Sequence, residues 1–439
     1  MTKIQHKLVV SAFATLFMAL LGAGSAVAQN NNTQSPFTRF GIGTVHKPST
    51  HATKGMGAVG LSVRDASLIN PLNPASYTAA DSMTFIFDFG LDLGASILQE
   101  GSKHFAMMQG NISYLSILFP FNKYVAFSAG LKPYSSVGYK YVVTSPVNNA
   151  PQSTYLTSFL GVGNISSVYA GLSVQPIKEW SIGLNGEFLF GTLTHQRSVA
   201  FDETLPDAYN PAFSDKLRLQ AGSLTAGTQV ELPLGKESDR TLVIGATYSP
   251  RLPMVSKQMR YNTIKRTGAE PVVILSDTVT SRNSYYTADS YGLGLGFKQG
   301  DKWFIGADFL YNRWGNSFLA TNDEYAGADQ WQVALGMSLT PDSRSRSYGK
   351  RVQYRWGLTM ENSPIKIKNT ATGALAGFYR AGASFGVGLP LVDRRSYVDL
   401  ALSYTRDIPT GAITLADNRI ELSVALRFNE AWFKKIRIE

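Results

Sequence analysis

The feature of this sequence that most constrains its fold is an alternation of apolar and polar residues with a period of two. In residues 418–429, Ile420, Leu422 and Val424 alternate with charged or small residues. The same alternation recurs in residues 180–188, 303–311, 331–339, 354–360 and 398–404. Because successive side chains of a β-strand point to opposite faces of the sheet, each of these stretches predicts a strand with one apolar face.

Two folds use such strands. A soluble sandwich buries the apolar faces between two sheets, whereas a transmembrane barrel turns them toward lipid. Here the apolar faces carry aromatic residues at strand ends, and the opposite faces mix charges with glycine, as girdles and a lumen do. The composition agrees, with 24 Phe, 21 Tyr, 40 Gly and only 16% charged residues. The sequence therefore predicts an all-β, transmembrane antiparallel β-barrel, with the sandwich as the alternative.

The spacing of turn signals predicts about fourteen strands. We expect them near residues 83–92, 107–119, 123–142, 165–176, 180–201, 216–234, 241–262, 289–299, 302–315, 329–340, 353–364, 378–390, 396–408 and 418–429. Tight connections alternate with long ones, which are expected at 143–164, 202–215, 263–288 and 365–377. The connection 340–352 is an exception, because it is long although it falls at the end of the barrel where the tight turns are expected. Outer-membrane barrels have short periplasmic turns and long extracellular loops, so both termini are expected in the periplasm.

The first residues predict export. Lys3 and Lys7 precede an apolar run from residue 8 to 21, and Ala26-Val27-Ala28 forms a small-x-small cleavage site. This arrangement is typical of a secretory signal peptide, because the apolar run is too short for a membrane helix. The sequence contains no Cys, so a disulfide framework is excluded.

A barrel of fourteen strands would enclose an open channel unless another segment filled it. Residues 29–82 precede the first predicted strand, and Gly41, Gly43 and Gly55 in this segment permit tight irregular packing. We therefore expect an N-terminal hatch (plug) inside the lumen. The predicted parts are a signal peptide (1–28), the hatch (29–82), the transmembrane β-barrel (83–429) and a periplasmic C-terminal tail (430–439).

The triplet Asn73-Pro74-Ala75 lies just before the first predicted strand and resembles the hatch signature of the outer-membrane long-chain fatty-acid transporter (FadL-like) family. The segments SPFTRFGIG (35–43), GMGAVG (55–60) and NEAWFKK (429–435) are similar to a Bacteroidetes-type branch of that family. The resemblance implies a plugged channel for passive uptake of hydrophobic small molecules such as long-chain fatty acids. It also implies capture at extracellular loops and lateral exit through a kinked third strand.

The resemblance implies two functional sites, and for each of them a purely structural role is the alternative. Asn73, Pro74 and Ala75 are candidates for ligand gating, or they form a well-capped turn that seats the plug. Gly130 and Pro133 in the third predicted strand are candidates for a lateral-opening kink, because Pro forfeits a ladder hydrogen bond, or they merely bend the strand.

The resemblance also implies an apolar capture groove formed by two long loops. The matching segments contain the candidate residues Leu205, Tyr209, Phe213, Val272, Val273, Ile274 and Leu275. Consecutive exposed aliphatic residues require an explanation. An additional short strand in the loop is the alternative.

Charged residues are expected on the lumenal face of the last strands. Arg355 and Arg380 are candidate carboxylate-binding residues, because a guanidinium binds a carboxylate through two parallel hydrogen bonds. The alternative is a ladder of ion pairs with acids such as Glu361 and Asp399 that stiffens the barrel.

Other function classes find little support. The five His residues show no metal-ligand spacing, and no strained nucleophile turn is present, so we expect no enzyme, no catalytic residue, no metal and no cofactor. The net charge of +10 is scattered singly, which argues against nucleic acid and is compatible with outer-membrane lipid and lipopolysaccharide. The barrel-assembly machinery is the expected partner during biogenesis. A non-transporting scaffold or secretion-system component acting through its loops is the alternative function, and an open porin is disfavoured by the hatch.

Overall fold

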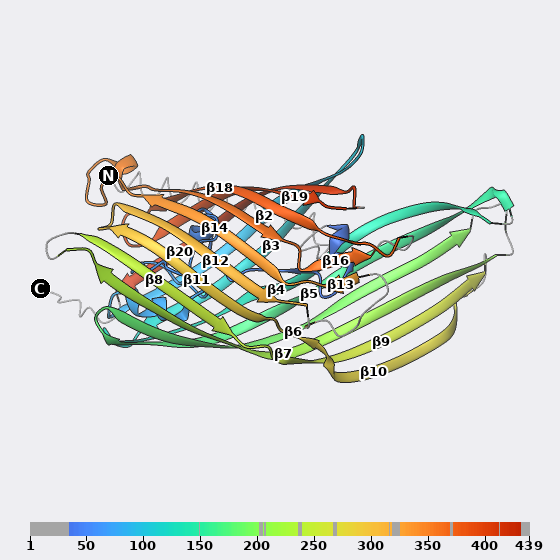
Figure 1. Ribbon diagram of the computed structural model, residues 1–439, viewed down its shortest axis with the longest axis horizontal. Coiled ribbons are helices and arrows are strands. Elements are labelled where there is room, and N and C mark those ends of the chain that lie inside the picture. The colour runs from blue at the N-terminus through green and yellow to red at the C-terminus, as the bar shows by residue number, and fades with distance from the viewer. Residues whose placement is uncertain are drawn as a thin grey trace, which may run out of the picture.

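The computed structural model describes residues 35–431, except for 149, 202–204, 206–207, 236–238, 267–269, 316, 318–324, 369–371 and 412. The chain forms a closed antiparallel barrel of fourteen strands (Figure 1). The ring closes where β20 pairs with β2, from Thr84 opposite Ala431 to Gln99 opposite Ala416. The predicted fold class is confirmed. The predicted signal peptide and most of the predicted C-terminal tail lie outside the described residues.

The barrel strands follow one another around the wall in chain order. They are β2 (Thr84–Glu100), β3 (Lys103–Pro120), β4 (Val125–Val147), β5 (Ala150–Ile177), β6 (Trp180–Phe201), β7 (Tyr209–Pro233), β8 (Arg240–Ser249), β11 (Asp289–Gln299), β12 (Trp303–Arg313), β14 (Gln330–Leu339), β15 (Gln353–Asn362), β18 (Phe378–Pro390), β19 (Tyr397–Pro409) and β20 (Ala416–Ala431). A small second sheet contains β13 (Tyr325–Gly327), β16 (Ile365–Lys368) and β17 (Leu375–Ala376). These bounds lie close to the expected strands in the second half of the chain.

The two ends of the barrel differ. The turns after β3, β5, β7, β11, β14 and β18 lie at one end, together with the start of β2 and the end of β20. We call this the turn end, and it includes the long connection 340–352, which contains the short helix α3 (Tyr348–Arg351). We call the opposite end the wing end.

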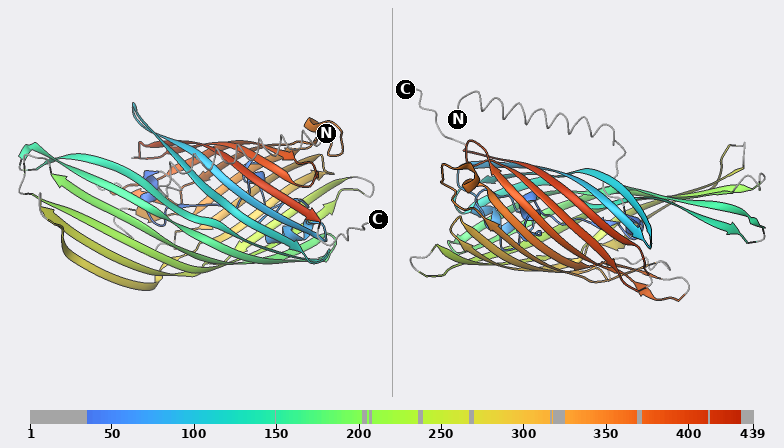
Figure 2. Two further views of the ribbon diagram at one scale, coloured as in Figure 1. Left: turned by 180° about the vertical axis from the view of Figure 1, so that it is seen from behind. Right: turned by 90° about the horizontal axis from the view of Figure 1, so that it is seen from above.

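The wing end is formed by strands where long loops were predicted. Residues 143–147, 150–164 and 209–215 belong to β4, β5 and β7, and 263–288 contains the end of β9 (Pro253–Arg266) and all of β10 (Val272–Tyr286). Together β4, β5, β6, β7, β9 and β10 form a sheet that projects beyond the rest of the barrel, which we call the wing (Figure 2). The prediction of long loops here was wrong, because neighbouring strands satisfy each other's backbone groups well beyond the apolar band.

One predicted strand, 241–262, is divided in the structure. It breaks between Ser249 and Pro253 into β8 and β9. Residues 226–233 of β7, toward the turn end, pair with β8, and residues 209–221, toward the wing end, pair with β9. Pro250 and Pro253 lack a backbone donor, so the ladder is interrupted where the wing leaves the barrel.

The outer face of the barrel is apolar and the inner face is mixed. Leu293, Leu335 and Leu358 are between 51% and 62% exposed and point outward, whereas the intervening positions are buried or are glycines. No helix among the described residues is long and apolar enough to cross a membrane.

Candidate functional site

The segment before the first barrel strand lies within the barrel (Figure 1). We call residues 35–83 the inner segment. It contains η2 (Pro36–Arg39), β1 (Thr44–Val45), α2 (His51–Lys54) and η3 (Pro74–Ala79). Its backbone and side chains bond to walls on different sides of the lumen. Gly57 N donates to Ser384 Oγ (2.9 Å), Leu61 N donates to Asp308 Oδ2 (2.8 Å) and Arg64 Nε donates to Glu231 Oε2 (2.8 Å).

The triplet Asn73-Pro74-Ala75 begins η3 and is buried. Asn73 caps the helix, because its Oδ1 accepts from Ala75 N at 3.1 Å. Its Nδ2 donates to Leu61 O (2.8 Å) and to Thr228 O of β7 (3.1 Å). These contacts support the role in seating the segment. A direct role in ligand gating stays a prediction.

Glycines of the barrel wall make room for the inner segment. A Cβ at Gly227 would lie 2.2 Å from Asn73 Oδ1, and one at Gly183 would lie 2.4 Å from the carbonyl carbon of Pro74. On the far wall a Cβ at Gly357 would lie 1.9 Å from the backbone nitrogen of Gly57. Only glycine permits such close approach of two backbones. The glycine-rich lumenal faces were visible in the sequence, but their individual partners were not.

The barrel wall is interrupted between β3 and β4. These strands pair only from Leu115 opposite Leu131 to Pro120 opposite Ala126. Beyond that point β3 continues to pair with β2, and β4 continues to pair with β5. The two hairpins therefore diverge toward the wing end (Figure 2).

Local irregularities in both strands accompany the divergence. The β4–β5 register shifts between Pro133 and Ser135, and the β2–β3 register shifts where Gly90 pairs with Tyr114 but Leu91 pairs with Ile112. Such bulges bend a strand and increase its local twist. The predicted kink residues Gly130 and Pro133 lie beside the divergence. Their role in lateral opening stays a prediction.

The inner segment occupies the edge of β4 that β3 leaves. Strand β1 pairs with β4, with Thr44 opposite Ser136 and Val45 opposite Ser135. His46 N donates to Tyr134 O at 2.8 Å, which extends the pairing past the bulge. Farther along, Ser35 N donates to Gly138 O at 2.8 Å. The interruption in the wall is thus bordered by a strand of the inner segment.

Two cavities lie on either side of residues 44–48, and both also border Pro133. The first, of about 210 Å³, is lined by the inner segment, the barrel wall and the wing-end connections, and it combines aromatic residues such as Phe37, Phe40 and Trp314 with the charged Lys132 and Glu187. The second, of about 230 Å³, is polar and borders β2, β3 and β20, with Asp92, Gln109, Asn111, Arg419 and Glu421 among its residues. Residues 44–48 form a partition between an aromatic-lined cavity and a polar cavity next to the wall interruption.

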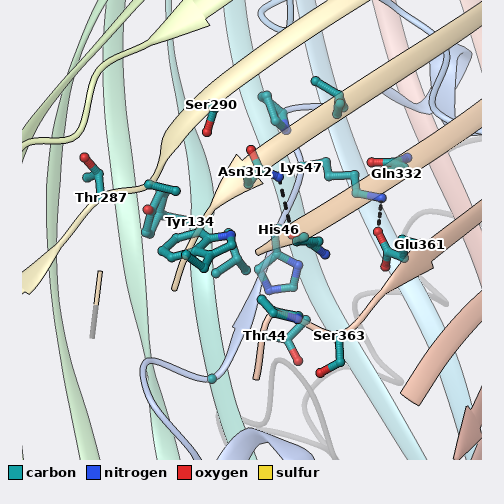
Figure 3. A pocket seen from close by; sticks show the side chains of 18 of the residues that line it. Thr44, His46, Lys47, Tyr134, Thr287, Ser290, Asn312, Gln332, Glu361 and Ser363 are labelled. Carbon is teal, nitrogen blue, oxygen red and sulfur yellow. Dashed lines mark hydrogen bonds and ion pairs between the residues drawn. The ribbon is translucent and has the colours of Figure 1, made fainter. Parts of the chain in front are cut away.

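The partition is tied to the opposite wall. Lys47 Nζ lies 2.5 Å from Glu361 Oε2 on β15 (Figure 3). Glu361 also accepts from Arg380 Nη1 at 3.3 Å. Arg380 forms a two-point interaction with Asp407, with Nε–Oδ1 and Nη2–Oδ2 distances of 2.6 and 2.8 Å. Arg380 lines both cavities, but its guanidinium group is already bound by the carboxylate of Asp407.

The second candidate arginine lies elsewhere. Arg355 is 2% exposed, lies 2.5 Å from Asp399 and also bonds to Gln353. It borders a different cavity, near Arg64 and Lys302 at the turn end. The structure therefore does not bring Arg355 and Arg380 into one site. Their contacts support the ion-pair alternative, and carboxylate binding stays a prediction.

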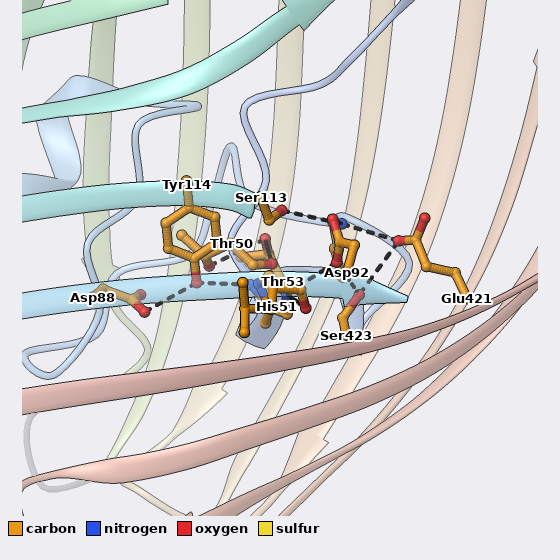
Figure 4. Close-up of polar contacts among 11 residues, drawn as sticks. Thr50, His51, Thr53, Asp88, Asp92, Ser113, Tyr114, Glu421 and Ser423 are labelled. Atoms are coloured by element: carbon orange, nitrogen blue, oxygen red, sulfur yellow. Dashed lines mark hydrogen bonds and ion pairs between the residues drawn. The ribbon is translucent and has the colours of Figure 1, made fainter. Parts of the chain in front are cut away.

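A second polar cluster anchors α2 to the wall (Figure 4). His51 Nε2 lies 3.0 Å from Asp92 Oδ1, and Lys54 Nζ lies 2.6 Å from Asp92 Oδ2 and 3.0 Å from Glu421 Oε1. His51 N donates to Tyr114 Oη at 3.2 Å. The sequence interpretation missed this cluster, because its members are far apart in the chain and follow no motif.

Two basic side chains of the inner segment have shifted pKa values. Burial lowers the pKa of His46 to about 4, with a further contribution from the Lys54 ammonium. Burial alone would lower the pKa of Lys54, but the carboxylates of Asp92 and Glu421 raise it above its usual value. At neutral pH His46 is therefore uncharged and Lys54 is charged.

The predicted capture residues lie on the wing. Tyr209 and Val272 are 58% and 59% exposed, and β9 separates their strands, β7 and β10. Val273, Ile274 and Leu275 are also exposed on β10. Leu205 precedes β7, and Phe213 lies on β7 beneath the guanidinium of Arg197, 4.7 Å from the ring centre. The two segments belong to one sheet, as the alternative of an additional strand anticipated, and whether they capture ligand stays a prediction.

Within the described residues, no group of three or more His, Asp or Glu side chains is arranged to hold a metal ion. No curated protein matches the sequence. Solved structures do match the fold. A Pseudomonas aeruginosa FadL homologue is 12% identical with a TM-score of 0.59, covering 88% of this chain and 99% of its own.

Two further solved structures are similar to this chain in fold. The Pseudomonas putida toluene transporter TodX is 14% identical with a TM-score of 0.58 and coverage of 88% and 99%. The CymD monoaromatic hydrocarbon channel is 12% identical with a TM-score of 0.57 and coverage of 86% and 97%. At these identities the similarity establishes the FadL-like barrel fold. A sequence model described as BamG matches residues 9–439, nearly the whole chain, and the protein therefore belongs to the BamG family.

Proposed function

We propose that this protein is an outer-membrane channel for passive uptake of hydrophobic small molecules, with long-chain fatty acids or similar amphiphiles as its substrates. In this proposal the inner segment acts as the hatch and the wing end faces the exterior. The Bacteroidetes-type branch suggested by the sequence motifs is part of the same proposal. The similar structures include a toluene transporter and a monoaromatic hydrocarbon channel, which handle apolar molecules.

The observation that carries the proposal is the partition of residues 44–48 beside the interrupted wall. Substrate enters the aromatic-lined cavity from the wing end, where burial stabilises each methylene by about 0.8 kcal/mol. Displacement of β1 from β4 then joins the two cavities and uncovers the edge between Leu131 and Gly138. Substrate leaves between β3 and β4 into the bilayer, so it never passes through the turn end of the barrel.

A reversible disulfide tests this route, because the chain contains no native Cys. Thr44 and Ser136 are Cα partners in an antiparallel pair. Such partners lie about 4.5–5.5 Å apart, within the range that a disulfide bridges. We expect the double variant Thr44→Cys/Ser136→Cys to lose most oleate uptake under oxidising conditions and to recover it after reduction.

A matched control places the disulfide beside the interruption rather than across it. Ile97 and Ala106 are Cα partners of β2 and β3. The double variant Ile97→Cys/Ala106→Cys should transport equally in both redox states. Full uptake by the oxidised Thr44–Ser136 variant, with cross-linking verified by mass spectrometry, would refute the partition as a gate.

A second candidate function is a non-transporting scaffold, and the wing favours it. Apolar residues such as Tyr209, Val272 and Ile274 are 54–59% exposed there, and exposed apolar patches commonly bind other proteins. The triple variant Tyr209→Ser/Val272→Ser/Ile274→Ser separates the two functions. Loss of co-purifying protein with unchanged uptake supports the scaffold, whereas reduced uptake at low oleate concentration supports capture.

A further inference from the structure

Three basic residues lie together on the outer face of the wall, where the wing leaves the barrel. They are Lys216 and Arg218 on β7 and Lys257 on β9. All three are exposed, whereas Leu217 and Leu219, which alternate with the basic residues of β7, are buried in the interior cluster. Because side chains alternate along a strand, the three basic side chains share the outward face.

The arrangement places like charges directly opposite each other. Arg218 and Lys257 are Cα partners, and Lys216 is the next outward residue on the same strand as Arg218. Cross-strand pairs of like charge are destabilising. Among the described residues, none of the three makes an ion pair or a side-chain hydrogen bond, although Lys132, Arg64 and Arg380 on the inner side all do. A negatively charged partner from outside the chain would relieve this repulsion.

The outward neighbours of the basic residues are uncharged, and three of them carry a hydroxyl group. Thr192 is the partner of Arg218 and Thr194 is the partner of Lys216, both on β6. On the other side Thr280 of β10 is the partner of Lys257. Hydroxyl groups add hydrogen-bond donors without adding negative charge. Met259 of β9, the partner of Lys216, is the apolar exception. These described neighbours add no carboxylate, so the patch presents cations and hydroxyls, a combination that suits a phosphate group.

The position of the patch identifies the kind of anion. The next outward row toward the turn end consists of Phe190, Gln220 and Val255, which are Cα partners in sequence across β6, β7 and β9. Phe190 and Val255 are 38% and 40% exposed, and Phe188 and Leu224 farther down are 51% and 38% exposed. The patch thus lies next to an exposed apolar surface on its turn-end side. A molecule with a phosphorylated headgroup and acyl chains would contact both.

We propose that Lys216, Arg218 and Lys257 bind the phosphorylated glucosamine headgroup of a lipid A-type molecule, whose acyl chains lie on Phe190, Leu224 and Val255. The proposal rests on the orientation given above, in which the wing end faces the exterior. Arg218 supplies a planar fork that matches a phosphate, and the two lysines supply point charges. The lipid would fix the height of the wing relative to the membrane.

Binding can be measured by native mass spectrometry of the full-length mature protein in detergent with defined lipid A. We expect wild type to retain bisphosphorylated lipid A at least about tenfold better than the variant Lys216→Gln/Arg218→Gln/Lys257→Gln, because each lost charged hydrogen bond corresponds to about tenfold or more. Dephosphorylated lipid A should bind weakly and equally to both. The heat-resistant migration of the variant on gels verifies that its barrel is folded.

A charge-matched control is Lys178→Gln/Lys302→Gln/Lys350→Gln, in which three exposed lysines at the turn end are replaced. It should bind lipid A as wild type does. Equal loss in this control would show that net charge, not the patch, attracts the lipid, and equal binding by the patch variant would also overturn the proposal. Displacement by millimolar inorganic phosphate would identify a small-anion site instead of a lipid site.

The lipid proposal and the transport proposal fail separately. Lipid retention is measured without substrate, and the Thr44–Ser136 cross-link lies in the inner segment away from the patch. Loss of lipid A in the patch variant with unchanged oleate uptake would leave both proposals standing. Lipid binding by the wing end together with absent uptake would overturn only the transport proposal.

Discussion

Lys47 of the inner segment and Glu361 of β15 form an ion pair across the lumen, with Nζ and Oε2 2.5 Å apart. The lysine side chain is 32% exposed and the glutamate side chain 9%. The pair connects the partition beside β4 to the opposite wall of the barrel. Because Glu361 is also bonded to Arg380, the wall side of this connection stays in place when Lys47 is changed.

Replacement of Lys47 should loosen the partition. A partly exposed ion pair contributes about 1 kcal/mol, so Lys47→Met should raise the population with β1 displaced by about fivefold. Oleate uptake at limiting concentration should rise accordingly. Lys178→Met, at an exposed turn-end position, is the control. Uptake no higher than in this control would mean that the ion pair does not hold the partition.

The glycines of the barrel wall should be required for the inner segment to pack against the wall. A Cβ at Gly227 would lie 2.2 Å from Asn73 Oδ1, so Gly227→Ala should displace the Asn73 cap, at a cost of about 1–3 kcal/mol for overpacking. We expect larger single-channel conductance in planar bilayers. Gly222→Ala on the same strand has no neighbour within 4 Å of the new Cβ and should conduct as wild type. Equal conductance of both variants would show that the contact does not seat the plug.

Arg380 tests the predicted carboxylate site. Its fork is held by Asp407 and Glu361, so Arg380→Leu should leave the buried carboxylate of Asp407 without its partner, whereas Glu361 keeps Lys47. Removing one member of a buried ion pair costs about 3–5 kcal/mol, and the barrel should lose heat resistance on gels. The ratio of oleate to oleyl alcohol affinity should not change. A selective loss of oleate binding, with the alcohol unaffected, would instead make Arg380 the carboxylate receptor.

The orientation of the barrel can be tested with single cysteines. Thr144→Cys lies on the wing part of β4, and Lys178→Cys lies in the turn between β5 and β6. A membrane-impermeant maleimide should label the first variant on intact cells. It should label the second only after the outer membrane is opened. Labelling of Lys178→Cys on intact cells would reverse the orientation on which the transport and lipid proposals rest.

The period-two pattern was sufficient to predict the barrel and most of its wall. Strands such as 289–299 and 378–390 were predicted with the bounds that β11 and β18 have. A lipid-facing side and a lumen-facing side impose opposite chemistry on alternate residues, so each such strand carries its own signal. In the proposed orientation the parts of the wing strands beyond Lys216, Arg218 and Lys257 lie outside the bilayer, so no lipid imposes an alternation on them. For this reason residues 143–164 and 263–288 were assigned to loops.

The candidate site was predictable only in its local parts. Pro133 removes a backbone donor and Asn73 caps a turn wherever they occur, so both could be identified from residue type. The pairing of Thr44 with Ser136, the ion pair of Lys47 with Glu361 and the fit of Asn73 against Gly227 join residues from about 90 to more than 300 positions apart. No local preference encodes such partners. They arise only when closure of β20 onto β2 surrounds the inner segment, which brings distant backbone and charged groups to within bonding distance in a space too small to leave them unpaired.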